Sequence, residues 1–409
     1  MSYKSYVSSN ELSSIEEDTE KRSSTVEVER NSPEDETKGM AEGGTRGWLT
    51  IAGVFLIQFS TFGYNISFGA YQGLLCQVLS DKILNLSNRP PYDDSWDPAS
   101  FIISQENQWY QVFLSHGIGT GLASGIVYIP TLAVVSHHFK NLRALAMGIV
   151  AAGTAAGAAV HPIILNHFFH SKIGFHNGVR ISAGINTVCF ILANLMMRTN
   201  PSPKTTTKVN VPLMSLFRDP AYNFMVFASI LSNFAMFFPG FFIQLSAVLR
   251  GIDRGTAFYY ISMLNGTSVL GRTLVPLLGP KVGVINLNII CASGIGICIF
   301  CLSAVNSTTG YILFAVFFGF ISGANVAIVA PAVASLSERV EEIGARMGVA
   351  FALSGFAALF ATPVSGALLT ADYHWDRPII FSGTCAIASA AAVLAARFFV
   401  VKRVGSHRV

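Results

Sequence analysis

The sequence predicts an all-α membrane protein built as a bundle of about ten transmembrane helices. Of the 409 residues, 51% are hydrophobic and 12% are charged, whereas soluble domains carry about 25% charged residues. The mean hydropathy is +0.50. Beyond residue 46, long stretches carry no charge and reach the ~20 apolar residues that a helix needs to cross a bilayer. These observations exclude a soluble globular fold.

The first 46 residues have a different composition from the rest. They hold six Lys/Arg against eleven Asp/Glu, and Ser, Glu and Thr dominate. Such a segment buries too little apolar surface to fold, and it lacks the apolar core of a secretory signal. We therefore expect residues 1–46 to be a disordered acidic tail in the cytoplasm.

Ten apolar runs along the remaining chain are long enough to span a membrane. Gly, Ala and Ser recur within them, which is typical of helices that pack closely in lipid. The predicted spans are 48–70, 111–135, 144–167, 178–198, 222–247, 256–278, 284–305, 310–335, 344–370 and 377–400.

Basic residues in the short loops predict the orientation. Lys and Arg gather in alternate loops and at the C-terminus, so the positive-inside rule places both termini in the cytoplasm of a multi-pass protein of the cell membrane. Two Asn-x-Ser/Thr sequons, at Asn85 and Asn306, fall in loops on the opposite side and are predicted glycosylation sites.

Motifs for other chemistry are missing from the sequence. Of the six cysteines, Cys298 and Cys301 form a Cys-x-x-Cys pair, but it stands in the middle of an apolar span, where packing is the expected role. The sequence contains no phosphate-binding Gly-x-x-x-x-Gly-Lys-Ser/Thr loop, which argues against an ATP-driven pump. We expect no enzyme activity, no metal or other cofactor and no nucleic-acid partner.

Four segments carry a resemblance to a known family. The stretch EGGTRGW at 42–48 precedes the first span, and HHFKNLRALAMGIVAAGTAAG at 137–157 opens the third. Further matches are NGTSVLGRTLVPLLGPKVGVIN at 265–286 and IGARMGVAFALSGFAALFATPVSGALL at 343–369. Together they resemble the monocarboxylate-transporter-like proteins of the major facilitator superfamily, in their fungal branch. The resemblance implies two six-helix halves that carry a solute by alternating access.

The chain departs from that family in its helix count. Members resemble one another in having twelve helices, and the pair without a counterpart here is the second and third. Residues 71–107 stand in their place and are too polar and proline-rich to span. Either this form is a truncated product of a transporter gene, or the segment contains helices that hydropathy misses. The expected organisation is 1–46 acidic tail, 47–198 incomplete first half, 199–219 cytoplasmic linker, 220–401 second half of six helices, and 402–409 cytoplasmic tail.

Arg272 is the best candidate for a functional residue, because an ionisable side chain within a span is costly. By resemblance it matches the intramembrane arginine that binds the substrate carboxylate, and its planar guanidinium suits that group. The alternative is that Arg272 extends to the lipid headgroups. In animal members an aspartate stands one turn before this arginine. The corresponding residue here is Ser268, which puts the family's mode of proton coupling in doubt.

Other polar residues in the spans and loops are weaker candidates. Asn325 and Asn233 either line a substrate cavity or join helices to one another. His161 titrates in the physiological range and is a candidate proton carrier, although a lone histidine in a helix is more often a packed residue. Lys140 and Arg143 form the basic pair of the second motif and are expected at the cytoplasmic surface.

The function expected from these features is secondary active transport of a small organic anion, a monocarboxylate or related metabolite. The partners would be this substrate, the lipid bilayer and a coupled proton. Three alternatives stay open: a degenerate transporter that no longer transports, a membrane sensor, and an exporter of a secondary metabolite.

Overall fold

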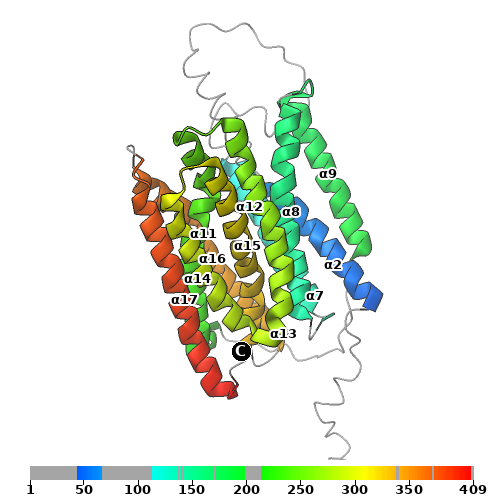
Figure 1. Cartoon of the computed structure of the whole chain (residues 1–409). Helices are drawn as coiled ribbons and strands as arrows, with labels where there is room; N and C mark the ends of the chain where they lie inside the picture. Colours follow the sequence, from blue (N-terminus) through cyan, green and yellow to red (C-terminus); the bar gives the residue numbers. More distant parts are fainter. Residues whose placement is uncertain are drawn as a thin grey trace, which may run out of the picture.

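Each of the ten predicted spans coincides with a helix in the computed structural model (Figure 1). The structure describes residues 44–66, 113–136, 138–139, 142–169, 171–198, 213–337, 340–370 and 373–406. The first half contributes α2 (Gly44–Gln58), η1 (Phe59–Gly63), α3 (Tyr64–Ile66), η2 (Phe113–Gly119), α7 (Thr120–Ser136), α8 (Arg143–Phe169) and α9 (Gly174–Met196). The second half contributes α10 (Leu213–Leu216), α11 (Pro220–Leu249), α12 (Arg254–Leu274), η3 (Val275–Leu278), α13 (Gly279–Val282), α14 (Val284–Cys301), η4 (Leu302–Ala304), α15 (Thr308–Ser335), α16 (Val340–Leu369) and α17 (Asp376–Val404).

Eight spans within the described residues are long and apolar enough to cross a membrane. The two other predicted spans are α7, which is shorter, and α12, which is more polar. The buried polar residues of α12, Asn265, Ser268 and Arg272, are covered by protein, because α12 packs against both α8 and α15. The expected absence of a helix pair falls on residues 71–107, which lie outside the described residues, and it stays a prediction.

Several spans contain local departures from the α-helix. In the first span, η1 is a π-helical turn that continues directly into α3. The predicted span 256–278 ends as the 3₁₀ turn η3, because Pro276 lacks the N–H that would continue an α-helix. The helix α11 starts sharply after Asp219, whose carboxylate accepts a hydrogen bond from the backbone N–H of Ala221 at 3.0 Å.

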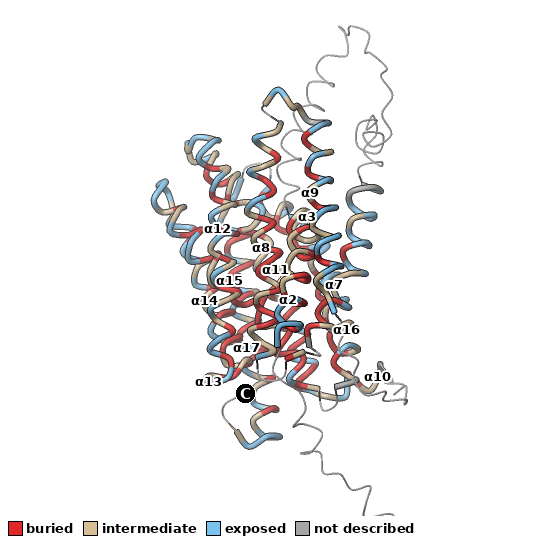
Figure 2. The backbone as a smooth tube through the Cα atoms, turned by 90° about the vertical axis from the view of Figure 1, so that its right-hand side faces the viewer, coloured by how far each residue is buried: buried red, intermediate tan, exposed pale blue. Residues whose placement is uncertain are grey.

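Buried residues gather along the inner faces of the helices, and the outward faces are largely exposed apolar surface (Figure 2). Of the eight spans, α8 is the most buried and α9 the least. The outward faces are consistent with contact to lipid, because no water-soluble protein of this size exposes so much apolar surface.

The two halves meet at one end of the bundle, which we call the basic end: the end where α8 begins at Arg143 and α17 ends at Val404 (Figure 1). One cluster of buried apolar residues contains members of both halves, for example Val54 and Met147 with Met225. A second cluster, toward the opposite end, contains only second-half residues from Ala235 to Ala386. The shared core therefore lies at the basic end.

Candidate functional site

Arg272 lies on α12 where the two halves face each other. Its side chain is buried, with a residue exposure of 8%. Nε donates a hydrogen bond to the Ser268 hydroxyl at 3.2 Å, one turn earlier on the same helix. One terminal nitrogen, Nη1, donates to the carbonyl oxygen of Ala151 on α8 at 2.7 Å. Arg272 thus connects the second half to the first, and whether it binds a substrate or extends to the lipid headgroups stays a prediction.

The guanidinium of Arg272 has neutral partners only. Among the described residues it forms no ion pair with a carboxylate, and its other terminal nitrogen has no hydrogen-bond partner. A buried charge without a counter-charge is expensive, since hydrogen bonds to neutral groups replace only part of its hydration. The arrangement fits a site that receives an anionic ligand.

Close contact between α8 and α12 holds this site in place. Gly148 on α8 lies against the backbone of α12: a Cβ there would overlap the Arg272 carbonyl oxygen and lie 2.9 Å from Pro276 Cγ. Gly157, further along α8, lies equally close to the Phe59 carbonyl of the first span. The glycines of the second sequence motif therefore let α8 approach both α2 and α12.

The basic pair of that motif is described only in part. Arg143 is the first residue of α8, and its Nε donates to the Phe139 carbonyl oxygen at 3.4 Å. Lys140 lies outside the described residues, so its predicted place at the cytoplasmic surface stays a prediction.

His161 is enclosed within the first half. Its ring is 1% exposed and contacts Phe59 at 4.7 Å and Tyr64 at 5.4 Å between ring centroids. Neither ring nitrogen has a described partner of normal hydrogen-bond geometry, although the Phe59 backbone lies close enough to interact with the ring. A proton-binding role of His161 stays a prediction.

The side chains of the two candidate asparagines form their hydrogen bonds within the second half. Asn325 is 1% exposed, accepts a hydrogen bond from the Ser232 hydroxyl at 3.2 Å and donates to the Asn288 side chain at 3.2 Å. These contacts join α11, α14 and α15. Asn233 donates to the Ser229 carbonyl of its own helix at 2.9 Å. In this structure Asn325 joins helices, and a role of either residue in substrate binding stays a prediction.

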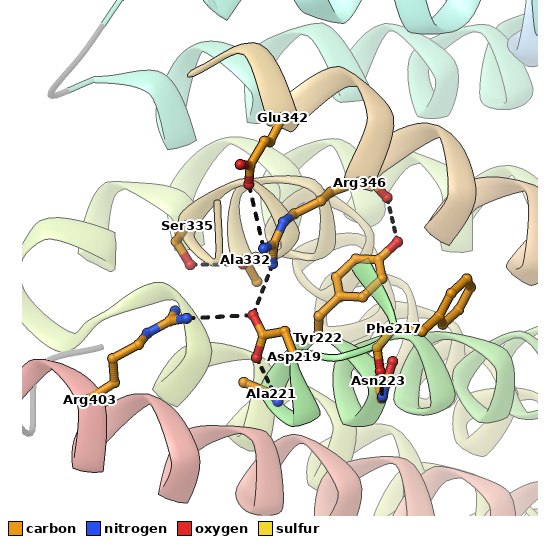
Figure 3. A network of polar contacts seen from close by, with 10 residues as sticks. All are labelled: Phe217, Asp219, Ala221, Tyr222, Asn223, Ala332, Ser335, Glu342, Arg346 and Arg403. Carbon is orange, nitrogen blue, oxygen red and sulfur yellow. Dashed lines mark hydrogen bonds and ion pairs between the residues drawn. The ribbon is translucent and has the colours of Figure 1, made fainter. Parts of the chain in front are cut away.

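A charged cluster at the basic end was not singled out from the sequence (Figure 3). Asp219 pairs with Arg346 of α16 at 2.9 Å and with Arg403 of α17 at 3.5 Å, and Arg346 also reaches Glu342 at 3.5 Å. The Tyr222 hydroxyl donates to the Arg346 carbonyl oxygen at 2.8 Å. This cluster ties together the ends of three helices of the second half.

At the opposite end, Asn306 is exposed next to the start of α15. Its side-chain oxygen accepts a hydrogen bond from Arg250 at 2.8 Å. Its exposure is compatible with glycosylation, which stays a prediction, and Asn85 lies outside the described residues.

Known proteins similar to this chain are membrane transporters. The chain is 29% identical to the aspyridones efflux protein apdF of Emericella nidulans, over 82% of this chain and 74% of that protein. It is 28% identical to the agnestins efflux protein AgnL12 of Paecilomyces divaricatus, over 86% and 87%. An MFS-type transporter of Gibberella moniliformis is 30% identical over 73% and 72%.

The fold is also similar to a solved structure. The transporter FucP in its outward conformation superposes with a TM-score of 0.56 at 14% identity, covering 86% of this chain and 85% of FucP. The family model of the Major Facilitator Superfamily matches residues 98–339, more than half of the chain. The resemblance to the superfamily is thereby confirmed, while the monocarboxylate-transporter-like branch stays a prediction. This multi-pass membrane protein belongs to the Major Facilitator Superfamily of transporters.

Proposed function

We propose that the chain exports a small organic anion of the secondary-metabolite kind across the cell membrane, and that Arg272 binds its negative group. The observation that carries the proposal is the buried guanidinium at the junction of the two halves, which among the described residues has only neutral partners and one terminal nitrogen without a hydrogen bond. A carboxylate or an acidic enol would supply the missing counter-charge through charge-assisted hydrogen bonds.

The direction of transport rests on the similar proteins. Two of them are named efflux proteins for secondary metabolites. This supports export of such a compound over uptake of a simple monocarboxylate.

The orientation and the working cycle follow from the positions of the charges and of the shared core. The basic end is the cytoplasmic end by the positive-inside rule, so both termini lie in the cytoplasm. Because the described halves share their core at that end, we infer a state that is open to the outside. Transport then requires the halves to separate at the basic end and to close at the other.

The test is uptake of radiolabelled organic acids, pyruvate and benzoate, into inside-out vesicles from a host that expresses the chain. We expect Arg272→Ala to lower uptake to the level of vesicles without the protein, and Arg272→Lys to retain a small part, since a lysine keeps the charge but not the planar fork. Arg250→Ala, which removes a partly exposed arginine at the opposite end, is the control. Uptake by Arg272→Ala equal to that of the unaltered chain would contradict the proposal. No uptake by the unaltered, folded chain would favour the non-transporting alternative.

We further propose that His161 carries the coupled proton, because its ring is buried within the first half and no described side chain forms a hydrogen bond with it. The neighbours that face it, Phe59 and Tyr64, carry no charge at neutral pH. His161→Gln should therefore abolish uptake driven by an imposed pH gradient but leave substrate exchange at equal pH intact. His167→Gln, on the exposed part of the same helix, should change neither. Gradient-driven uptake by His161→Gln at the normal rate would rule this role out.

A further inference from the structure

Three aromatic side chains form a chain of ring contacts across the junction of the two halves. Phe62 of η1 meets Tyr128 of α7 with ring centroids 5.0 Å apart and the planes at 62°. Tyr128 in turn meets Phe351 of α16 at 5.6 Å and 87°. We call Phe62, Tyr128 and Phe351 the aromatic cluster. Its members come from three separate helical segments, and the contact between Tyr128 and Phe351 crosses from the first half to the second.

None of the three rings is fully buried. Each is of intermediate exposure, unlike the buried core positions around them such as Leu132 and Met347. Partly exposed aromatic residues at the junction of the two halves leave some of their surface open to a further contact. A ring from another molecule could complete the edge-to-face arrangement that the three side chains begin.

The aromatic cluster lies next to the cation of the candidate site. Tyr128 is within electrostatic range of Arg272. The Arg272 guanidinium and Tyr128 of the aromatic cluster therefore belong to one region at the junction of the two halves. A guanidinium also stacks on aromatic faces, so the two features recognise the same kind of molecule.

We propose that the site selects aromatic organic anions: compounds that carry a carboxylate or acidic enol on a planar ring. Arg272 binds the negative group, and the aromatic cluster packs against the ring. A small aliphatic acid would satisfy Arg272 and leave the three rings in water, so it would bind more weakly. This inference rests on the proposed transport function and narrows its substrate class.

The test uses the inside-out vesicles and three competing probes: one has both an aromatic ring and a negative charge, and each of the others lacks one of these two features. Unlabelled 2-naphthoate, its saturated-ring counterpart decahydronaphthalene-2-carboxylate, and the uncharged 2-naphthalenemethanol compete with labelled benzoate. We expect 2-naphthoate to compete at a concentration at least about tenfold below the other two, the difference that roughly one to two ring contacts supply. Phe351→Leu should remove most of the preference for 2-naphthoate over the saturated acid. Phe356→Leu, on the same helix but 67% exposed on the outward surface, should leave it unchanged.

The outcomes separate this inference from the function on which it rests. Equal competition by the aromatic and saturated acids, with uptake still abolished in Arg272→Ala, would overturn the aromatic preference and leave anion transport standing. Uptake that is indifferent to Arg272→Ala would overturn both. The comparison of the three probes is made on the unaltered chain, so it decides the matter even if Phe351→Leu fails to fold.

Discussion

At the scale of single residues, the second half contains two buried arginines in opposite situations. Arg346 is 6% exposed and pairs with the carboxylates of Asp219 and Glu342. Arg272 is 8% exposed and has a hydroxyl and a carbonyl as partners. Arg346 is neutralised by described carboxylates and therefore has a structural role, whereas Arg272 has no carboxylate partner among the described residues, which is why we propose it as the anion-binding residue.

Removing the charge of Asp219 tests the structural role. Asp219→Asn leaves Arg346 with Glu342 alone and loosens the connection to Arg403. Loss of one partner from a buried ion pair costs about 3 kcal/mol, so the melting temperature of the purified protein should fall by several degrees. Asp376→Asn removes an exposed carboxylate at the start of α17 and should leave it unchanged. An unaltered melting temperature in Asp219→Asn would mean that the cluster contributes nothing to stability.

Only Arg272 of these two arginines could be singled out from the sequence as a functional candidate. Arg272 interrupts an apolar span, and the cost of a charge in that place marks it without knowledge of the fold. Asp219 and Arg346 are 127 residues apart, one in a predicted loop and the other at the edge of a predicted span, so their pairing emerges only from the packing of α11 against α16. Tyr128 is similar: within an apolar run nothing distinguishes it from a core aromatic until Arg272 is placed beside it.

At the scale of helices, α12 shows why hydropathy alone is an incomplete guide. The polar residues Asn265, Ser268 and Arg272 make it too hydrophilic to count as a span on its own. It is nevertheless enclosed, because α8 and α15 lie on either side and cover those groups. Within the described residues, the order of the helices was predictable from sequence. The π-helical turn η1 was not, because it depends on how the first span fits against α8.

A substitution that adds a single methyl group to α8 should force α8 and α12 apart. Gly148→Ala places a Cβ against the Arg272 carbonyl oxygen and Pro276, so the helices must move apart. Overpacking of this kind costs about 1–3 kcal/mol. We expect a lower melting temperature and vesicle uptake reduced by at least about tenfold, since roughly 1.4 kcal/mol corresponds to that factor. Gly266→Ala on α12 meets no other atom within 4 Å and is the matched control. Normal uptake by a folded Gly148→Ala protein would show that this approach is not needed for transport.

At the scale of the whole molecule, the two halves share a core at the basic end and not at the other. The contacts of Gly148 with Arg272 and of Ala144 with Gly279 all lie at that end. The central claim is that these contacts belong to one state of the transport cycle and break in the next. A permanent link between them must then stop transport.

A disulfide between positions 144 and 279 tests this claim most directly. A Cβ built at Gly279 lies 3.7 Å from Cβ of Ala144, close to the ~3.8 Å typical of disulfides. Ala144→Cys and Gly279→Cys are introduced together into a chain whose six native cysteines are replaced by serine, and each single cysteine variant serves as the control. The account predicts that oxidation links the pair, that uptake into inside-out vesicles falls to background, and that a reducing agent restores it. Full uptake by the oxidised, linked protein, or failure of the pair to link at all, would contradict it.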